Sequence, residues 1–168
     1  MKTRPLLGRI DTDWRARRPG LDPTPMRRLI LLARTARAAA EAVEQTQLRH
    51  GLNSAQADLL LTLYRSAPAE GLTPSQLTEL SAVSASSVTN RLDRLTAEGM
   101  IERRTDPQDA RARRVSLTSA GRQRVEALLP DRLAGEERLL SALSETEQAE
   151  LERLLLRLVD ALEEDSEE

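Results

Sequence analysis

A stretch rich in hydroxyl and amide side chains lies in the middle of the chain, and its residue types suit contacts to nucleic acid. Such small polar groups hydrogen-bond base edges and phosphates, and they let a helix sit deep in the major groove. Behind them, Val88, Leu92 and Leu95 repeat at helical spacing. A cap and loop would have a similar serine content, but the apolar period continues for about three turns and favours a recognition helix. The candidate DNA contacts are Ser84, Ser86, Ser87, Thr89, Asn90 and Arg94.

Arginines crowd around a polar turn further along the chain. The segments 101–105 and 113–117 resemble two short strands, and the polar residues 106–109 between them predict a turn. Alternate strand residues point to opposite faces, so these arginines cannot all serve one contact. Arg111 is the best candidate for the minor groove, with Asp109 placed to brace its guanidinium, and Arg113 is a further candidate. A solvated or ion-paired surface role is the alternative, and we expect it for most of the set Arg103, Arg104, Arg111, Arg113 and Arg114.

Charge is unevenly distributed along the chain, although the net value is only −2. Residues 84–124 contain nine arginines and five acidic residues, a balance of +4, whereas residues 135–168 contain three arginines and twelve acids, a balance of −9. A nucleic-acid-binding protein can be acidic overall when its basic surface is local. Codon usage in a GC-rich genome would also explain a high total of arginine, so only the local clusters indicate function.

Composition argues against several classes of protein. The chain has no cysteine, so it has no disulfide, thiolate zinc site or thiol nucleophile, and its one histidine, His50, has no evident carboxylate partner. It has no glycine-rich phosphate loop, no apolar run of about 20 residues and no visible signal peptide. We therefore expect neither an enzyme nor a membrane protein, but a cytoplasmic protein without metal or cofactor. A helical adaptor that does not bind DNA is the alternative, and the clustered arginines argue against it.

The apolar spacing predicts a mainly α-helical protein with a small β-hairpin wing. Helix starts or ends are indicated at Gly51, Asn53, Thr73-Pro74, Ser84, Gly99, Thr118 and Ser144-Glu145-Thr146-Glu147. Pro130 should kink or break the helix that starts near Thr118. A short helix, a turn, a second helix and a hairpin make a winged helix-turn-helix.

Three regions follow from this order of elements. Residues 1–50 would form an extra N-terminal helix and a long helix for dimerisation and ligand binding. Residues 52–121 would form the winged helix-turn-helix DNA-binding domain, and residues 122–168 the C-terminal dimerisation helices. The terminal helices are rich in leucine and alanine, and they cannot all bury their apolar faces in so small a domain, so we expect them to pack against a second copy.

Residues 72–121 resemble the MarR family of bacterial regulators. The likeness lies in residues 77–80, 89–95, 98–104, 106–111 and 117–121, and the flanking helices extend it over nearly the whole chain. Ala110 departs from the family, which usually has an arginine there, and this implies a wing contact weaker by one phosphate interaction. The resemblance implies a homodimer that binds a pseudo-palindromic DNA site, usually as a repressor, and a small ligand that releases the DNA.

The helix bearing Trp14 and the segments 58–68 and 89–91 resemble the urate-responsive, HucR-like branch of that family. The resemblance implies that urate, or a similar aromatic anion, is bound by Trp14, Asp58, Arg91 and Arg103. Guanidinium groups supply charge and planar donors to a flat anion, an indole supplies a flat wall, and a carboxylate accepts a ligand N–H.

Each of these four residues has a plainer alternative role. Trp14 could anchor the extra helix, Asp58 could be a charge favoured by the helix dipole, Arg91 could contact phosphate, and Arg103 could pair with a glutamate. The effector has alternatives too, because a phenolate or a xanthine presents similar chemistry. A ligand bridging a recognition helix and a wing strand would bias the orientation of the DNA-binding region, whichever anion it is.

Overall fold

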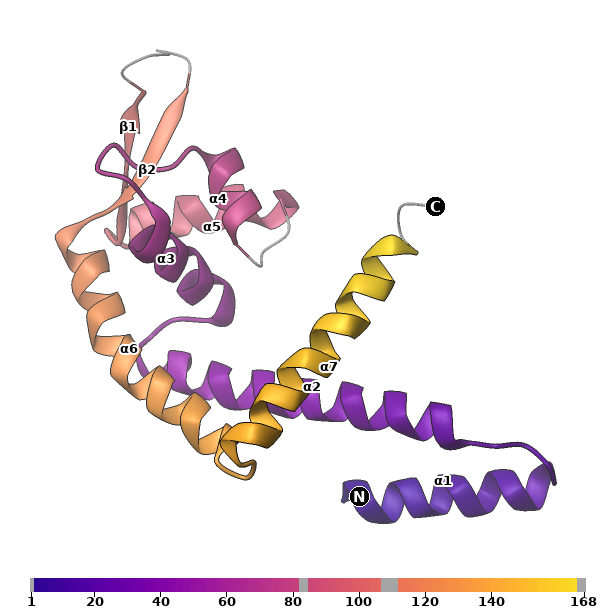
Figure 1. Cartoon of the computed structure of the whole chain (residues 1–168). Helices are drawn as coiled ribbons and strands as arrows, with labels where there is room; N and C mark the ends of the chain where they lie inside the picture. The colour runs from indigo at the N-terminus through magenta and orange to yellow at the C-terminus, as the bar shows by residue number, and fades with distance from the viewer. Residues whose placement is uncertain (1, 82–84, 107–111, 166–168) are drawn as a thin grey trace.

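The computed structural model describes residues 2–81, 85–106 and 112–165, without the side chains of 85–87 and 89. Over these residues the chain forms seven helices and one antiparallel hairpin (Figure 1). They are α1 (Thr3–Arg17), α2 (Thr24–Arg49), α3 (Ser54–Ser66), α4 (Pro74–Leu80), α5 (Ala85–Ala97), β1 (Ile101–Thr105), β2 (Arg113–Leu117), α6 (Ser119–Leu140) and α7 (Glu145–Glu164). The predicted mainly helical fold with a small hairpin is confirmed. None of the helices in this described part is long and apolar enough to cross a membrane.

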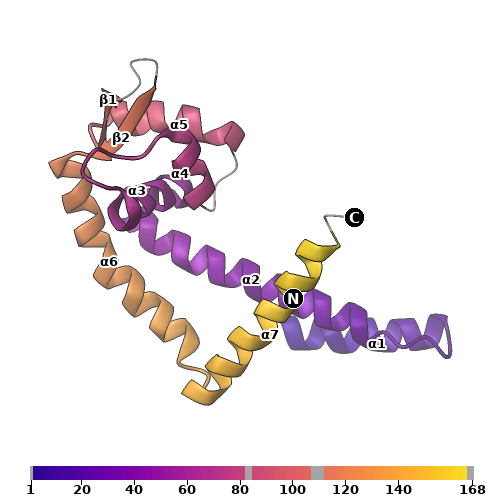
Figure 2. The ribbon, with the colours of Figure 1, turned by 45° about the horizontal axis from the view of Figure 1, so that its top comes forward.

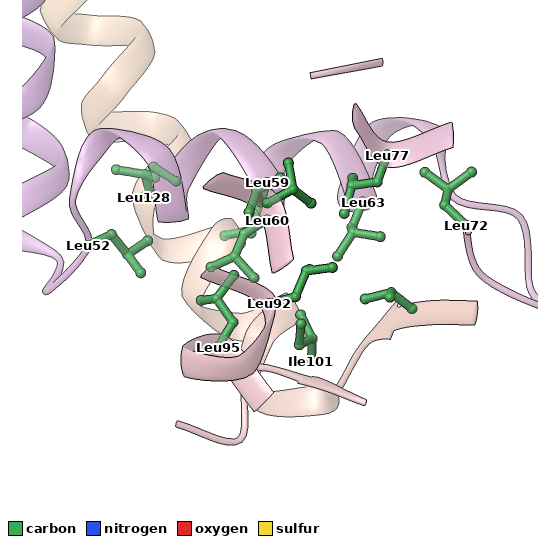
Figure 3. Packing of buried hydrophobic residues seen from close by; sticks show 14 residues of the cluster. Leu52, Leu59, Leu60, Leu63, Leu72, Leu77, Leu92, Leu95, Ile101 and Leu128 are labelled. Carbon is green, nitrogen blue, oxygen red and sulfur yellow. The ribbon is translucent and has the colours of Figure 1, made fainter. Parts of the chain in front are cut away.

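The elements from α3 to β2 pack around one hydrophobic core, and we call them the winged head. Val88, Leu92 and Leu95 of α5 face this core with at most 2% of their surface exposed, as their spacing predicted. They meet buried leucines of α3 and α4, and Figure 3 shows the leucine side chains of these three helices converging. Burying each such side chain contributes about 1.5–3 kcal/mol. The core therefore fixes which face of α5 is left for a partner.

The hairpin is held to the loop before α4 as well as to itself. β1 pairs with β2 antiparallel, and Leu72 forms an isolated bridge to Val115 with backbone hydrogen bonds of 2.9 and 2.7 Å. Gly71 permits this approach because its φ is +87°, and a Cβ there would lie 2.5 Å from the carbonyl oxygen of Val115. The hairpin and the start of the helix-turn-helix therefore share a backbone contact.

Two pairs of helices extend from the winged head, α1 with α2 and α6 with α7, and we call them the arms (Figures 1 and 2). Helix α1 packs on α2, with Asp11 and Arg27 3.6 Å apart, at the end of α2 that is distant from the winged head. Many large apolar side chains of the arms are exposed: Leu29, Leu31, Leu32, Leu133, Leu139, Leu140, Leu154, Leu155, Leu156, Leu158, Val159 and Leu162. Exposed apolar surface on this scale is typical of an interaction site.

Most predicted helix ends are confirmed by their caps. Capping boxes join Asn53 to Gln56, Thr73 to Gln76 and Ser144 to Glu147, while the predicted cap Ser84 lies outside the described residues. Pro130 was expected to kink or break its helix, and the structure excludes the break, because α6 runs through it. The carbonyl that loses its hydrogen bond belongs to Glu126, an exposed residue, so water can satisfy it.

Candidate DNA-binding surface and effector site

Helix α5 presents polar side chains on the face opposite the core. Asn90 and Arg94 are exposed, and the Nε of Arg94 donates a hydrogen bond of 3.0 Å to Glu98. Of the other predicted contacts on this helix, Ser86, Ser87 and Thr89 have backbone but no side chain within the described part, and Ser84 lies outside it. The described face thus offers an amide and a guanidinium, the groups that bind adenine and guanine or phosphate.

Of the predicted wing contacts, Arg113 lies in the described part of the hairpin. Arg113 is exposed opposite Thr105 and donates a hydrogen bond to the Thr105 hydroxyl. Asp109 and Arg111, the residues expected to enter the minor groove, lie outside the described residues. Arg113 is therefore the first described cation after that turn in the sequence.

One face of the hairpin is joined to helix α5 by an ion pair. Arg103 of β1 reaches Asp93 of α5 with an N–O distance of 2.7 Å, and the two side chains are 32% and 59% exposed. A glutamate was the expected partner in the alternative role of Arg103, and the observed partner is an aspartate of the preceding helix, α5. The pair links the two elements predicted to contact DNA.

The hairpin has a second, more deeply buried ion pair. The Nε of Arg114 lies 2.5 Å from the Asp106 carboxylate, and its NH1 donates a 3.0 Å hydrogen bond to the carbonyl of Gly71. The exposed fractions are only 19% for Arg114 and 6% for Asp106. A planar guanidinium can serve both acceptors at once. Arg114 therefore joins the two sides of the hairpin, next to its turn, to the loop before α4.

The next arginine along β1 lies on the opposite face from Arg103, as strand alternation predicted. Arg104 pairs with Glu102 at 2.7 Å, and Glu102 also accepts a hydrogen bond from the Ser116 hydroxyl. They border a hollow of about 420 Å³ beside Tyr64 and Arg122. The guanidinium of Arg122 lies 5.4 Å above the Tyr64 ring, a cation–π contact that stabilises this outer surface.

The four predicted effector residues fall into two places. Asp58 on α3, Arg91 on α5 and Arg103 on β1 lie on neighbouring elements of the winged head, and the first two are half-buried. Trp14 is 36% exposed on α1, beside a surface hollow of about 250 Å³. Since α1 lies away from the winged head in both views (Figures 1 and 2), one chain does not bring all four together.

The junction between the winged head and the arms has polar contacts of its own. The NH1 of Arg124 donates a 2.5 Å hydrogen bond to the carbonyl of His50, and the His50 ring lies 2.9 Å from the Asp131 carboxylate. His50 therefore has a carboxylate partner, which its sequence neighbourhood did not indicate. These contacts tie the end of α2 to the middle of α6.

Known proteins share this fold. The MarR family model matches residues 50–112. The HTH-type transcriptional regulator PecS of Dickeya dadantii is 30% identical over 149 residues, which are 89% of this chain and 90% of PecS. The chain belongs to the MarR family. The transcriptional repressor MprA of Escherichia coli K12 is 32% identical over 113 residues, covering 67% of this chain and 64% of MprA.

Among solved structures, a MarR mutant from E. coli in complex with operator DNA has a TM-score of 0.69 to this chain at 27% identity. The likeness covers 80% of this chain and 93% of that one. The winged-helix fold predicted from the sequence is thus confirmed, and this MarR-family member is a DNA-binding transcriptional regulator.

Asp93 and Asp106, which help to organise the winged head of this MarR-family protein, were not predicted as contacts, and Arg114 was expected only as one of the solvated or ion-paired surface arginines. Arg114 and Asp106 flank the hairpin turn, and a pairing across it could have been suspected from their opposite charges. Asp93 had no such signal, because its contact with Arg103 depends on the angle between α5 and β1.

Proposed function

We propose that the protein is a homodimer that binds a pseudo-palindromic duplex site as a repressor and is released by urate or a similar aromatic anion. The observation that supports DNA reading most directly is the exposed polar face of α5 beside an arginine-rich hairpin. The +4 balance of residues 84–124 gives this region the charge that phosphates attract. The repressor MprA, a relative, supports repression rather than activation.

Dimerisation is supported by the arms. Exposed leucines on α2, α6 and α7 form apolar faces that one chain leaves uncovered. The two arms also differ in charge, because residues 1–40 contain ten basic and three acidic residues whereas residues 135–168 have a balance of −9. We therefore keep the division into 1–50 for dimerisation and ligand binding, 52–121 for DNA binding and 122–168 for dimerisation.

The effector site is proposed at Asp58, Arg91 and Arg103, with Trp14 as its fourth member. Two guanidinium groups and one carboxylate on three packed elements suit a flat anion with N–H donors. Because α1 lies far from the winged head of its own chain, we propose that Trp14 joins the site from the second copy. A phenolate or xanthine effector is the alternative for the same residues.

The DNA claim is tested by selecting duplexes from a random pool and measuring binding to the winning sequence. We expect two half-sites about one helical turn apart and an affinity that falls steeply with salt. Asn90→Ala should relax base preference, and Arg111→Ala should reduce the salt slope by about 1. Arg37→Ala, which removes an arginine that is 82% exposed on α2, is the charge-matched control. DNA binding without sequence preference would refute the proposal that the protein recognises a specific operator.

The effector claim is tested by titrating urate, salicylate and xanthine against the complex with the selected duplex. Trp14 is the only tryptophan, so its fluorescence reports directly on ligand binding at α1. We expect urate to quench this fluorescence and to release the DNA, and Arg91→Gln to abolish both responses. If urate at millimolar concentration does neither, the urate assignment is wrong and the DNA claim is unaffected.

A further inference from the structure

The hairpin is attached on two sides that differ sharply in their access to solvent. On one side Arg114 binds Asp106 and the carbonyl of Gly71, and neither charged side chain is more than 19% exposed. On the other side Arg103 binds Asp93, and those side chains are 32% and 59% exposed. One attachment is therefore sheltered from solutes, and the other is open to them.

This difference decides which attachment a dissolved anion can break. An anion can bind a paired guanidinium only by displacing the carboxylate already bound to it, and for this the ion pair must be accessible to solvent. Arg103 meets this condition, because its partner Asp93 is the more exposed member of the pair. An exposed ion pair is also weak, shifting an equilibrium by about two- to five-fold, so a ligand with further contacts can outcompete it.

We propose that Asp93 is a built-in competitor of the effector for Arg103, so that ligand binding and attachment of the hairpin to the recognition helix exclude each other. This inference rests on the effector site proposed above. In the free protein, the Arg103–Asp93 pair holds β1 against α5 in the arrangement that contacts DNA. A bound anion takes the Arg103 guanidinium and Asp93 is released, while the hairpin keeps its attachments through Arg114, the Leu72–Val115 bridge and the core.

The exclusion predicts effects of opposite sign on the two ligands. Linkage requires that a change that favours the released state weakens DNA and strengthens effector by related factors. Asp93→Asn removes the competing charge, so urate should bind about two- to five-fold more tightly and the selected duplex about two- to five-fold more weakly. A residue that only stabilised the fold would not strengthen the binding of any ligand.

The experiment measures duplex and urate dissociation constants and thermal midpoints for five proteins: wild type, D93N, E102Q, D93R and D93R/R103D. E102Q is the matched control, because it removes one negative charge from a 2.7 Å arginine pair on the other face of the same strand. D93R places a cation opposite Arg103 and should bind DNA more weakly than wild type. D93R/R103D restores the pair in reverse, so duplex affinity should recover to within about two-fold while the urate response is lost.

Three results would overturn the proposal. The first is a D93N protein that matches E102Q in both affinities. The second is a D93R protein that binds the duplex as well as D93R/R103D does, because restoring the ion pair in reverse would then have no effect on DNA binding. The third is a wild-type protein that does not bind urate, which refutes both the effector and the competition for it. In that case the recovery in D93R/R103D still decides whether the pair positions the hairpin for DNA.

Discussion

Replacing Arg114 with methionine tests the buried attachment of the hairpin. The change keeps much of the apolar stem and removes the guanidinium that faces the Asp106 carboxylate, which is only 6% exposed. Removing one partner of a buried ion pair typically costs about 3–5 kcal/mol. Because Arg114 is itself 19% exposed, water can replace part of the contact, and we expect a loss near about 3 kcal/mol in the free energy of unfolding.

Urea unfolding followed by circular dichroism at fixed protein concentration measures this loss. With a slope of about 2–3 kcal/mol/M, the unfolding midpoint should fall by about 1 M. Arg104→Met is the control, because it breaks an exposed pair on the same hairpin and should change stability by no more than about 1 kcal/mol. If the two variants unfold at the same urea concentration, Arg114 does not stabilise the winged head as argued.

Three further predictions concern the core, a loop and a helix cap. Leu92→Ala empties a site that is 1% exposed and should lower the unfolding free energy by about 2–5 kcal/mol, measured by urea titration. Gly71→Ala places a side chain at a position with a φ of +87°, where it meets the backbone of Val115, so hydrogen exchange of the Leu72 amide should accelerate. Unchanged protection of this amide would contradict the close approach of the loop to the hairpin. Hydrogen bonds from the backbone N–H and the hydroxyl of Ser144 lower the pKa of Glu147. The cap therefore stabilises α7 fully at pH values above the usual pKa of a glutamate, and this stabilisation is lost as the pH falls through the lowered pKa. Wild type should lose more helicity than Glu147→Gln on acidification, as measured by circular dichroism.

The elements of this fold were largely predictable because their signals are local. Capping pairs such as Thr73 with Gln76 lie three residues apart, and the strands 101–105 and 113–117 have the bounds that their composition indicated. Such contacts form within one turn or one hairpin, so no knowledge of the tertiary arrangement is needed.

The contacts that organise the sites were not predictable in the same way. Asp131 lies 81 residues from His50, and Arg103 meets Asp93 only because the core sets the angle between α5 and β1. Trp14 and Arg91 were placed in one ligand set by resemblance, whereas α1 lies away from the winged head of its own chain, and we therefore proposed that Trp14 joins the site from a second copy. Charges alone do not specify such pairs, because the sequence offers each arginine many possible acidic partners.

The contacts of His50 with Arg124 and Asp131 lie at the C-terminal end of a long helix, α2. Helix α2 has 26 residues, so at about 1.5 Å per residue it extends about 39 Å from this junction. A rotation of about 5° at its base displaces its far end by about 3 Å, close to the spacing of about 3.4 Å between base pairs. If the arms of two chains are joined, the stiffness of this junction, to which these hydrogen bonds and the packing of α2 on α6 contribute, affects the spacing at which the two α5 helices engage one operator.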